Sequence, residues 1–234
     1  MILFKKKIVV TGGEGRFASV LKKTKSNYDY LFPSKKTLNI LNVNSIRKYI
    51  QKYKPKYLLH CAGLSRPMII HETNFKKSID LNIIGTANVT KICGEYNVKL
   101  IYFSTGYVYE GKIGNYKETS PVLPINKYAW SKLGGECAVK LYKNSLILRI
   151  IMCEKPFLHK SAFKDIKTNF IFHEDVAKFI PKILNKKGIL NVGGKIQSVY
   201  NFAKKYNKFI KKTSGRKVFP PNPSMNITKL KKII

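Results

Sequence analysis

The sequence predicts an α/β fold, in which a doubly wound parallel sheet is covered by helices on both faces. Apolar and amphipathic segments alternate through the first two thirds of the chain, and a glycine-rich turn follows the first apolar segment. A chain of 234 residues that is 44% hydrophobic is also long enough to bury one substantial core. We expect strands near Lys7, Tyr28, Tyr57, Leu100 and Ser145, with helices near Arg16, Asn44, Phe75 and Tyr128 between them.

The first strand and its turn form a pattern typical of nucleotide binding. A short apolar strand leads into residues 11–18 (TGGEGRFA), and a helix-compatible stretch begins at Arg16 and Phe17. Gly12 permits the tight turn, and Gly15 allows the backbone to approach a pyrophosphate at the positive end of the helix. Glycine-rich turns also close ordinary loops, so it is the position after the first strand that favours a dinucleotide site.

The end of the second strand, near residues 28–32, indicates which dinucleotide would bind. Ser34, Lys35 and Lys36 follow this strand without a carboxylate. A hydroxyl and two ammonium groups suit a 2′-phosphate, whereas an acidic residue would bind the ribose hydroxyls of NAD. We therefore expect NADPH, with NADH as the alternative. In that alternative the two lysines are ordinary solvated side chains, and Asp29 supplies the acid if the strand ends earlier.

Residues 128–132 (YAWSK) form the second informative segment. Residues four apart lie on one helix face, so the ammonium of Lys132 is expected beside the Tyr128 ring, where it favours the phenolate. Tyr200 and Lys204 have the same spacing, but only Tyr128 is preceded by an apolar strand that ends in two hydroxyls. We expect Tyr128 to release a proton, and Tyr200 to be a partly buried aromatic residue beside a solvated lysine.

These motifs resemble those of the extended short-chain dehydrogenase/reductases, and most of all those of the dTDP-4-dehydrorhamnose reductase family. The resemblance spans nearly the whole chain. Its other segments are residues 38–42 (LNILN), 60–63 (HCAG), 81–88 (LNIIGTAN), 103–111 (FSTGYVYEG) and 221–226 (PNPSMN). It implies a Rossmann-type fold and hydride transfer from a nicotinamide cofactor to a carbonyl carbon.

The resemblance also implies roles for individual residues. Thr105 would orient and polarise a substrate carbonyl, Tyr128 would donate its proton, and Lys132 would bind the nicotinamide ribose and tune Tyr128. Two hydroxyl donors would then meet the charge that develops on the carbonyl oxygen. Alternatively, the Thr105 hydroxyl only caps the strand end. The other cofactor contacts implied are Asn39, Ile40, Cys61, Ala62 and Gly63, and Gly106 and Tyr107 would lie beside the substrate.

The reaction implied is NADPH-dependent reduction of the 4-keto group of a nucleotide-linked 4-keto-6-deoxy sugar. Related 4,6-dehydratases follow their threonine with an Asp-Glu pair, but Gly106 and Tyr107 follow Thr105 here, so elimination lacks its carboxylates. Two alternatives stay open. An NAD-dependent sugar-nucleotide 4-epimerase would keep its dinucleotide through turnover, and a noncatalytic nucleotide-binding regulatory subunit of the same fold would bind without turnover.

We expect residues 1–150 to form the dinucleotide-binding domain, and residues 151–234 a small, reduced substrate-binding portion with elements that return to the sheet. The chain is shorter than is usual in the resembled family, and the missing length falls after Arg149. Lys155 and Phe157 are candidates for the sugar-nucleotide pocket, since a lysine can meet a diphosphate and an aromatic ring can stack on a base or sugar. The alternative is a surface loop with buried aromatic anchors.

The charge of the chain is strongly positive, with 45 basic and 12 acidic residues giving a net charge of +33. The lysines are scattered and far outnumber the arginines, so we expect nonspecific adhesion to polyanions at low salt and no specific nucleic-acid binding. The four cysteines and four histidines have no metal-ligand spacing, so no metal site is expected. The opening residues lack the order of a secretory signal, and no membrane span is evident. We expect a cytoplasmic protein with reduced thiols, and leave a homodimer open.

Overall fold

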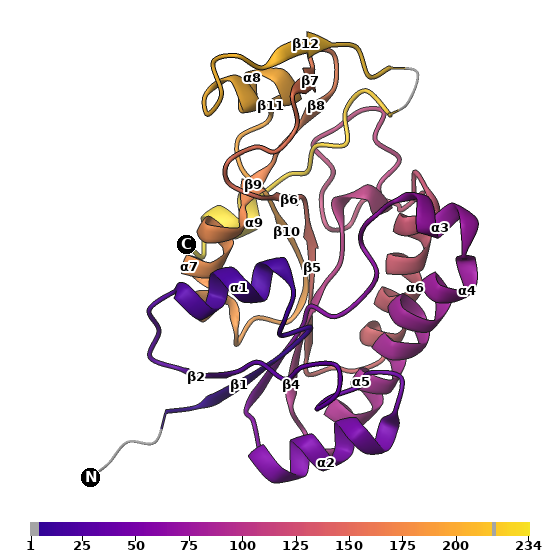
Figure 1. Ribbon diagram of the computed structural model, residues 1–234, viewed down its shortest axis with the longest axis vertical. Helices are drawn as coiled ribbons and strands as arrows, with labels where there is room; N and C mark the ends of the chain where they lie inside the picture. The colour runs from indigo at the N-terminus through magenta and orange to yellow at the C-terminus, as the bar shows by residue number, and fades with distance from the viewer. Residues whose placement is uncertain (1–4, 217–218) are drawn as a thin grey trace.

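The computed structural model describes residues 5–216 and 219–234 and has a parallel sheet of six strands at its centre (Figure 1). In order across the sheet the strands are β10 (Gly188–Val192), β5 (Ser145–Ile150), β4 (Lys99–Phe103), β3 (Tyr57–His60), β1 (Lys7–Thr11) and β2 (Asp29–Leu31). The chain runs from β1 to the edge strand β2 and then returns to β3 on the other side. The predicted doubly wound α/β fold is confirmed, and its strand order reverses between β1 and β3.

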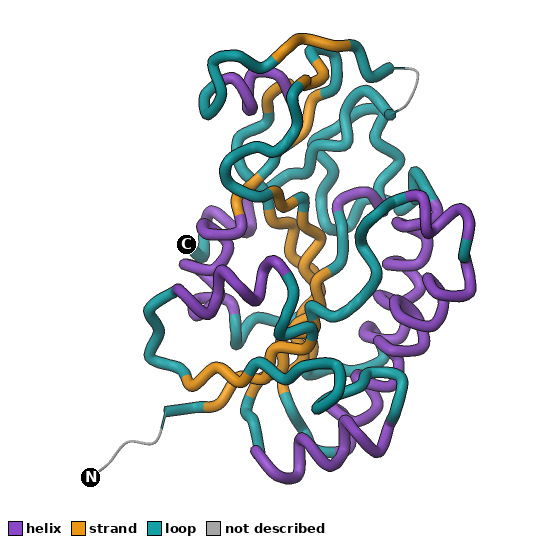
Figure 2. The backbone as a smooth tube through the Cα atoms, viewed as in Figure 1, coloured by secondary structure: helices purple, strands orange, loops and turns teal. Residues whose placement is uncertain are grey.

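Helices cover both faces of this sheet (Figures 1 and 2). One face carries α1 (Arg16–Lys23), α7 (His173–Ile183) and α9 (Thr228–Lys231), and the other carries α2 (Val43–Tyr53), α5 (Gly85–Glu95) and α6 (Lys127–Lys140). The two-residue period of a strand directs Ile8 and Val10 into one core and Val9 into the other. Burial on both faces explains why the strands read as continuous apolar runs.

The helix predicted near Phe75 is part of a longer helical stretch. After α3 (Ile69–Thr73), the segments α4 (Phe75–Ser78), η1 (Ile79–Ile84) and α5 follow one another, and η1 is π-helical. Irregular turns of this kind often occur at functional sites because they redirect a side chain. Within the two described ranges, no helix combines the length and the apolar character that crossing a membrane requires.

Beyond β5, short paired segments form a cluster above the carboxyl end of the sheet, drawn at the top of Figure 1. The pairs are β6 (Met152–Cys153) with β9 (Ile171–Phe172), β7 (Ser161–Phe163) with β12 (Lys211–Thr213), and β8 (Lys167–Thr168) with β11 (Gln197–Ser198), followed by α8 (Val199–Lys204). Phe157, Phe172 and Phe202 lie in the core of this cluster. The predicted domain boundary near residue 150 stays a prediction.

A segment late in the chain, residues 222–226, lies against the carboxyl end of β4. Asn169 Nδ2 donates a hydrogen bond to the Met225 carbonyl at 3.1 Å, and the Met225 N–H donates to Asn169 Oδ1 at 3.1 Å. The Asn115 N–H donates to Ser224 Oγ at 3.1 Å. Met225 is fully buried, so this segment is part of the folded body. The predicted absence of a secretory signal rests partly on residues 1–4, which lie outside the described residues.

Candidate functional site

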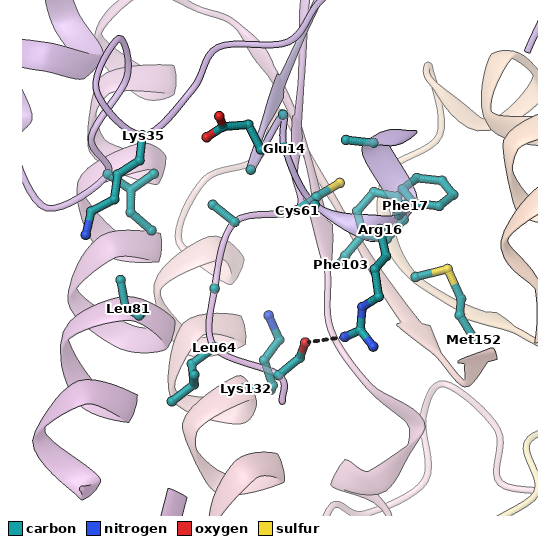
Figure 3. A pocket seen from close by; sticks show the side chains of 18 of the residues that line it. Glu14, Arg16, Phe17, Lys35, Cys61, Leu64, Leu81, Phe103, Lys132 and Met152 are labelled. Atoms are coloured by element: carbon teal, nitrogen blue, oxygen red, sulfur yellow. Dashed lines mark hydrogen bonds between the residues drawn. The ribbon is translucent and has the colours of Figure 1, made fainter. Parts of the chain in front are cut away.

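Two cavities adjoin at the carboxyl ends of β1, β3 and β4. The first, of about 390 Å³, is lined by the glycine-rich turn, by the loops that follow β2 and β3, and by α6 (Figure 3). The second, of about 540 Å³, lies between β4, α6 and the cluster above the sheet. Both cavities are lined by Arg16, Ser65, Ser104, Tyr128, Met152 and His173. Molecules bound in the two cavities would therefore meet beside Tyr128.

The glycines of the glycine-rich turn allow it to pack closely on the loops that follow β2 and β3. Gly12 has a φ of +70°, and a Cβ on it would lie 3.0 Å from the Ala62 backbone. A Cβ on Gly13 would come within 2.6 Å of the Phe32 backbone. Gly15 is the N-cap of α1 and has no side chain to occupy the first-turn amides. The turn thus fits a pyrophosphate, which binds well at the positive end of a helix.

Nearly all the cofactor contacts predicted from the sequence line the first cavity. They are Gly12, Gly15, Arg16, Phe17, Lys35, Asn39, Ile40, Cys61, Ala62, Gly63, Tyr128 and Lys132. Ser34 lies outside this lining, and its hydroxyl is 3.1 Å from Thr37 Oγ1, so its prediction as a cofactor contact is not supported. Asp29 pairs with Lys7 at the amino end of β1, the end remote from the turn, so the suggestion that it supplies a ribose-binding acid is wrong.

The three predicted catalytic residues converge where the cavities adjoin. Thr105 lines the second cavity, Lys132 lines the first, and Tyr128 lines both. Burial raises the pKa of Tyr128 to about 12, against the opposing effects of the Thr105 hydroxyl and the guanidinium groups of Arg66 and Arg16. Tyr128 therefore keeps its proton throughout the neutral pH range, as a proton donor must. Thr105 also caps a turn, because its hydroxyl accepts a hydrogen bond from the Tyr107 N–H at 3.2 Å.

Lys132 does not tune Tyr128 as the sequence predicted. Its ammonium nitrogen lies 4.2 Å from the centroid of the Tyr102 ring, and burial lowers the pKa of Lys132 to about 7. The cations that lower the pKa of Tyr128 are Arg66 and Arg16 instead. The expectation of a phenolate favoured by Lys132 is wrong because the lysine is desolvated and packs on a different ring. With a pKa of about 7, Lys132 is charged in about half of the molecules at pH 7, and its amino group can donate hydrogen bonds to ribose hydroxyls in either form.

Replacement of Lys132 by methionine is expected to stabilise the protein in acid. Lys132 has a pKa of about 7 when folded and an ordinary value of 10.5. Between these two pH values the folded state therefore binds fewer protons than the unfolded state. The resulting loss in the free energy of unfolding grows as pH falls from about 10.5 to about 7 and is constant below that. Lys132→Met removes the penalty, so its Tm should exceed that of the wild type most at pH 6 and least above pH 10. Equal differences at both pH values in thermal denaturation would contradict this, and Lys140→Met, an exposed change on the same helix, is the control.

Asn82, in the π-helical η1, holds the walls of the first cavity together. Its Oδ1 accepts from the Leu64 N–H at 2.7 Å, and its Nδ2 donates to the Leu64 carbonyl at 2.9 Å and to Ser131 Oγ at 2.8 Å. Ser131 in turn donates to the Tyr128 carbonyl at 2.7 Å. Asn82 thus fixes the loop after β3 relative to Tyr128. A buried asparagine within an apolar run was the available signal, but sequence reasoning did not assign it to the site.

A buried ion pair supports the strand end that carries Ser104 and Thr105. Arg149 of β5 donates from Nη2 to Glu136 Oε2 of α6 at 2.8 Å, and the two side chains are 5% and 1% exposed. The Ser104 hydroxyl donates to Glu136 Oε1 at 2.5 Å, and Arg149 Nη1 donates to the Tyr109 hydroxyl at 3.0 Å. Both carboxylate oxygens are therefore satisfied, by Ser104 just after β4 and by Arg149 on β5.

His60 is a buried packing residue. Its ring lies between the hydroxyls of Thr11, at 2.8 Å, and Thr86, at 3.1 Å. Burial lowers the pKa of His60 to about 3, so the ring is neutral. All four cysteines are free, and Cys137 is exposed while Cys93 and Cys153 are buried.

The second cavity contains part of the predicted substrate contacts. Tyr107 and Phe157 line it, but Gly106 and Lys155 do not. The space that a Cβ on Gly106 would need is filled by Ile151, at 2.7 Å. The predictions for Gly106 and Lys155 as substrate contacts are therefore not supported. Residues that line this cavity and that sequence reasoning missed include Arg66, Glu154, Phe170 and His173.

Comparisons with known proteins point to one family. Residues 6–153, more than half of the chain, match the family described as RmlD substrate binding domain. The chain is 32% identical over 143 residues to methionine adenosyltransferase 2 subunit beta of Xenopus laevis, covering 57% of this chain and 42% of that protein. It is 27% identical over 148 residues to dTDP-4-dehydrorhamnose reductase of Aggregatibacter actinomycetemcomitans, covering 61% and 50%. It thus spans about half the length of these relatives.

Solved structures share the fold over nearly the whole chain. The dTDP-4-dehydrorhamnose reductase of Bacillus anthracis, solved in complex with NADP, has a TM-score of 0.88 at 23% identity and is matched over 99% of this chain and 93% of its own. The UDP-glucose 4-epimerase of Thermotoga maritima, solved with UDP-glucose, has a TM-score of 0.74 at 19% identity, over 97% and 91%. At these identities the likeness concerns the fold alone.

Proposed function

This chain belongs to the RmlD substrate binding domain family, and from that premise we propose that it reduces the 4-keto group of a nucleotide-linked 4-keto-6-deoxy sugar with NADPH. The observation that carries the proposal is the position of Tyr128. It lines both cavities, with Lys132 in the first and Thr105 in the second. A proton donor at this place can reach a carbonyl held against a cofactor in the neighbouring cavity.

The first cavity is proposed to hold the dinucleotide, which supplies a hydride to the carbonyl carbon when bound. The glycine-rich turn and the first-turn amides of α1 would bind its pyrophosphate, and Lys132 would bind a ribose. In the second cavity, Tyr128 would give its proton to the carbonyl oxygen, and Thr105 would donate a hydrogen bond to the same oxygen. Hydride and proton together convert the ketone to an alcohol.

Lys35 is proposed to distinguish NADPH from NADH. It lines the first cavity on the side opposite Arg16, whereas Lys36 lies outside the lining (Figure 3). We expect Lys35→Gln to weaken NADPH binding about 10-fold, the effect of losing one charge-assisted hydrogen bond, and to leave NADH binding unchanged. Titration calorimetry with both dinucleotides measures this, with Lys36→Gln as the matched control. Equal losses for both dinucleotides, or none, would refute this role of Lys35 and leave Glu14, which lines the same cavity, as the candidate ribose-binding carboxylate for NADH.

A noncatalytic nucleotide-binding subunit is the second candidate. It is favoured by the 32% identity to methionine adenosyltransferase 2 subunit beta, which exceeds the 27% identity to the reductase. Against it stands the retention of Thr105, Tyr128 and Lys132 at one place. A 4-epimerase is a third candidate function, and it would convert its substrate without net consumption of the dinucleotide.

One assay separates these functions. Purified protein at about 0.15 M salt, where surface charges are screened, is mixed with NADPH and with dTDP- or UDP-linked 4-keto-6-deoxy sugars. Substrate-dependent loss of NADPH absorbance is the expected result. NADPH binding without turnover would favour the noncatalytic subunit. Interconversion of sugar-nucleotide epimers with no net NADPH consumption would favour the epimerase.

A further inference from the structure

An arginine pair on the wall of the second cavity is not explained by the proposed chemistry. Arg16 Nη1 and Arg66 Nη1 both donate to Glu154 Oε1, at 2.6 and 2.9 Å. Glu154 is largely buried, with 19% of its side chain exposed, whereas Arg16 and Arg66 are 46% and 45% exposed. The three residues come from α1, the loop after β3 and the segment after β6, so one carboxylate fixes two guanidinium groups from separate parts of the fold.

The charge of this cluster suits an anion. Glu154 is the sole acidic residue among the described residues that line the second cavity, where Arg16, Arg66 and Lys160 are basic. Burial alone would raise the pKa of Glu154, but a backbone hydrogen bond and the two guanidinium groups lower it, so the carboxylate is ionised. The cluster of Arg16, Glu154 and Arg66 then carries a net charge of +1.

Arg66 has N–H donors that bind no other described residue. A guanidinium carries five N–H donors in a fork that matches two phosphate oxygens. Among the described residues, the hydrogen bonds of Arg66 use Nη1 alone, on Glu154. Arg16 has fewer unused donors, because its Nη2 also donates to Ser65 Oγ at 3.3 Å. The donors on Nε and Nη2 of Arg66 are thus free to bind a ligand.

The dinucleotide and the nucleotide-linked substrate both carry phosphates, and the position of Arg66 indicates which of them it would bind. Arg16 lines both cavities, but Arg66 lines only the second. That cavity otherwise has aromatic walls, including Tyr107, Phe157 and Phe163, which can stack on a base or sugar. The guanidinium also lies near enough to Tyr128 to lower its pKa. A phosphate on Arg66 would therefore sit in the second cavity, close to the proton donor.

We propose that Arg66, oriented by Glu154, binds the diphosphate of the nucleotide-linked substrate and so determines the specificity of the second cavity for that class. The inference rests on the proposed function for the placement of substrate in this cavity. Glu154 acts as a positioning residue that holds the guanidinium toward the cavity while Arg16 remains at the boundary with the dinucleotide.

Binding of dTDP, measured by titration calorimetry at about 0.15 M salt, tests this. We expect Arg66→Gln to weaken dTDP binding about 10- to 100-fold, the loss of a charge-assisted hydrogen bond pair, and to leave NADPH binding within twofold. Retained NADPH binding also shows that the variant is folded. Arg47→Gln removes an arginine from an exposed pair with Glu95, outside both linings, and serves as the control.

The companion variant Glu154→Gln removes the negative charge and keeps an acceptor oxygen. It should weaken dTDP binding several-fold, because a neutral amide holds the Arg66 guanidinium less firmly than a carboxylate does. Binding by Glu154→Gln as tight as that of the wild type would refute the positioning role of Glu154, and loss of NADPH but not dTDP affinity in Arg66→Gln would overturn the proposal, because it would assign Arg66 to the dinucleotide. Absence of dTDP binding in the wild type would also overturn it. These measurements need no turnover, so Arg66-dependent dTDP binding in a protein that oxidises no NADPH would refute only the proposed reduction.

Discussion

Tyr128→Phe is expected to lower NADPH-dependent turnover about 10²- to 10⁴-fold, the contribution of a well-placed general acid. The substitution removes the phenolic proton and keeps the ring, which lies 5.1 Å from the ring of His71. The affinity for NADPH should stay within twofold, because the rest of the first cavity is unchanged. Steady-state NADPH oxidation and equilibrium binding of NADPH, measured on the same preparation, separate the two effects.

Tyr200→Phe is the matched control for this experiment. Tyr200 and Lys204 repeat the spacing of Tyr128 and Lys132, but they lie on α8 in the cluster above the sheet, where the Lys204 nitrogen is 5.8 Å from the Tyr200 ring centroid. Turnover of Tyr200→Phe should equal that of the wild type. A Tyr128→Phe variant that retained most of its turnover would show that the proton comes from another group and would refute the proposed role of Tyr128.

Arg149→Leu is expected to destabilise the protein by about 3–5 kcal/mol, because it leaves the buried Glu136 carboxylate without its cation. Since a loss of 1 kcal/mol lowers Tm by roughly 2–4 °C in a chain of this size, thermal denaturation should show a fall of about 10 °C. Removing Glu136 as well, in Glu136→Met with Arg149→Leu, should restore most of the loss, because apolar residues can replace a buried pair.

The exposed pair of Arg47 and Glu95 provides the comparison for this prediction. Arg47 Nη2 lies 3.0 Å from Glu95 Oε2, and about a third of each side chain is exposed. Arg47→Leu should therefore cost less than about 1 kcal/mol. If Arg149→Leu cost no more than this, the buried pair would contribute nothing specific to stability, and the support it gives to Ser104, just after β4, would be refuted.

The sequence predicted the sheet and the glycine-rich turn well because both depend on local patterns. Apolar runs marked the strands, and the order of strand, turn and helix placed Gly12 at a position that needs a positive φ. Tyr128 could be singled out as a candidate because helix periodicity and the preceding strand are also local signals, and the structure places it where the two cavities adjoin.

The errors concern contacts between distant parts of the chain. Lys132 packs on Tyr102, a residue of β4, and no spacing within α6 could show that. Glu154 joins Arg16 across 138 positions and Arg66 across 88. Lys155 and Phe157 are two residues apart, yet only Phe157 lines the cavity, since the short strands nearby pair with partners remote in sequence.

The packing of residues 222–226 against Gly106 affects the order in which parts of the chain can fold as it is synthesised. Ser224 bonds to Asn115 across 109 positions, and a Cβ on Gly106 would lie 2.8 Å from the Met225 sulfur. Contacts between such distant positions form slowly, because a long loop must close first, and synthesis delivers β4 well before Met225. The glycine-rich turn packs on Phe32 and Ala62, which are made early, whereas the strand end that bears Thr105 acquires its final support only after residue 226 is made. The turn of the first cavity should thus be complete before the wall of the second cavity during synthesis.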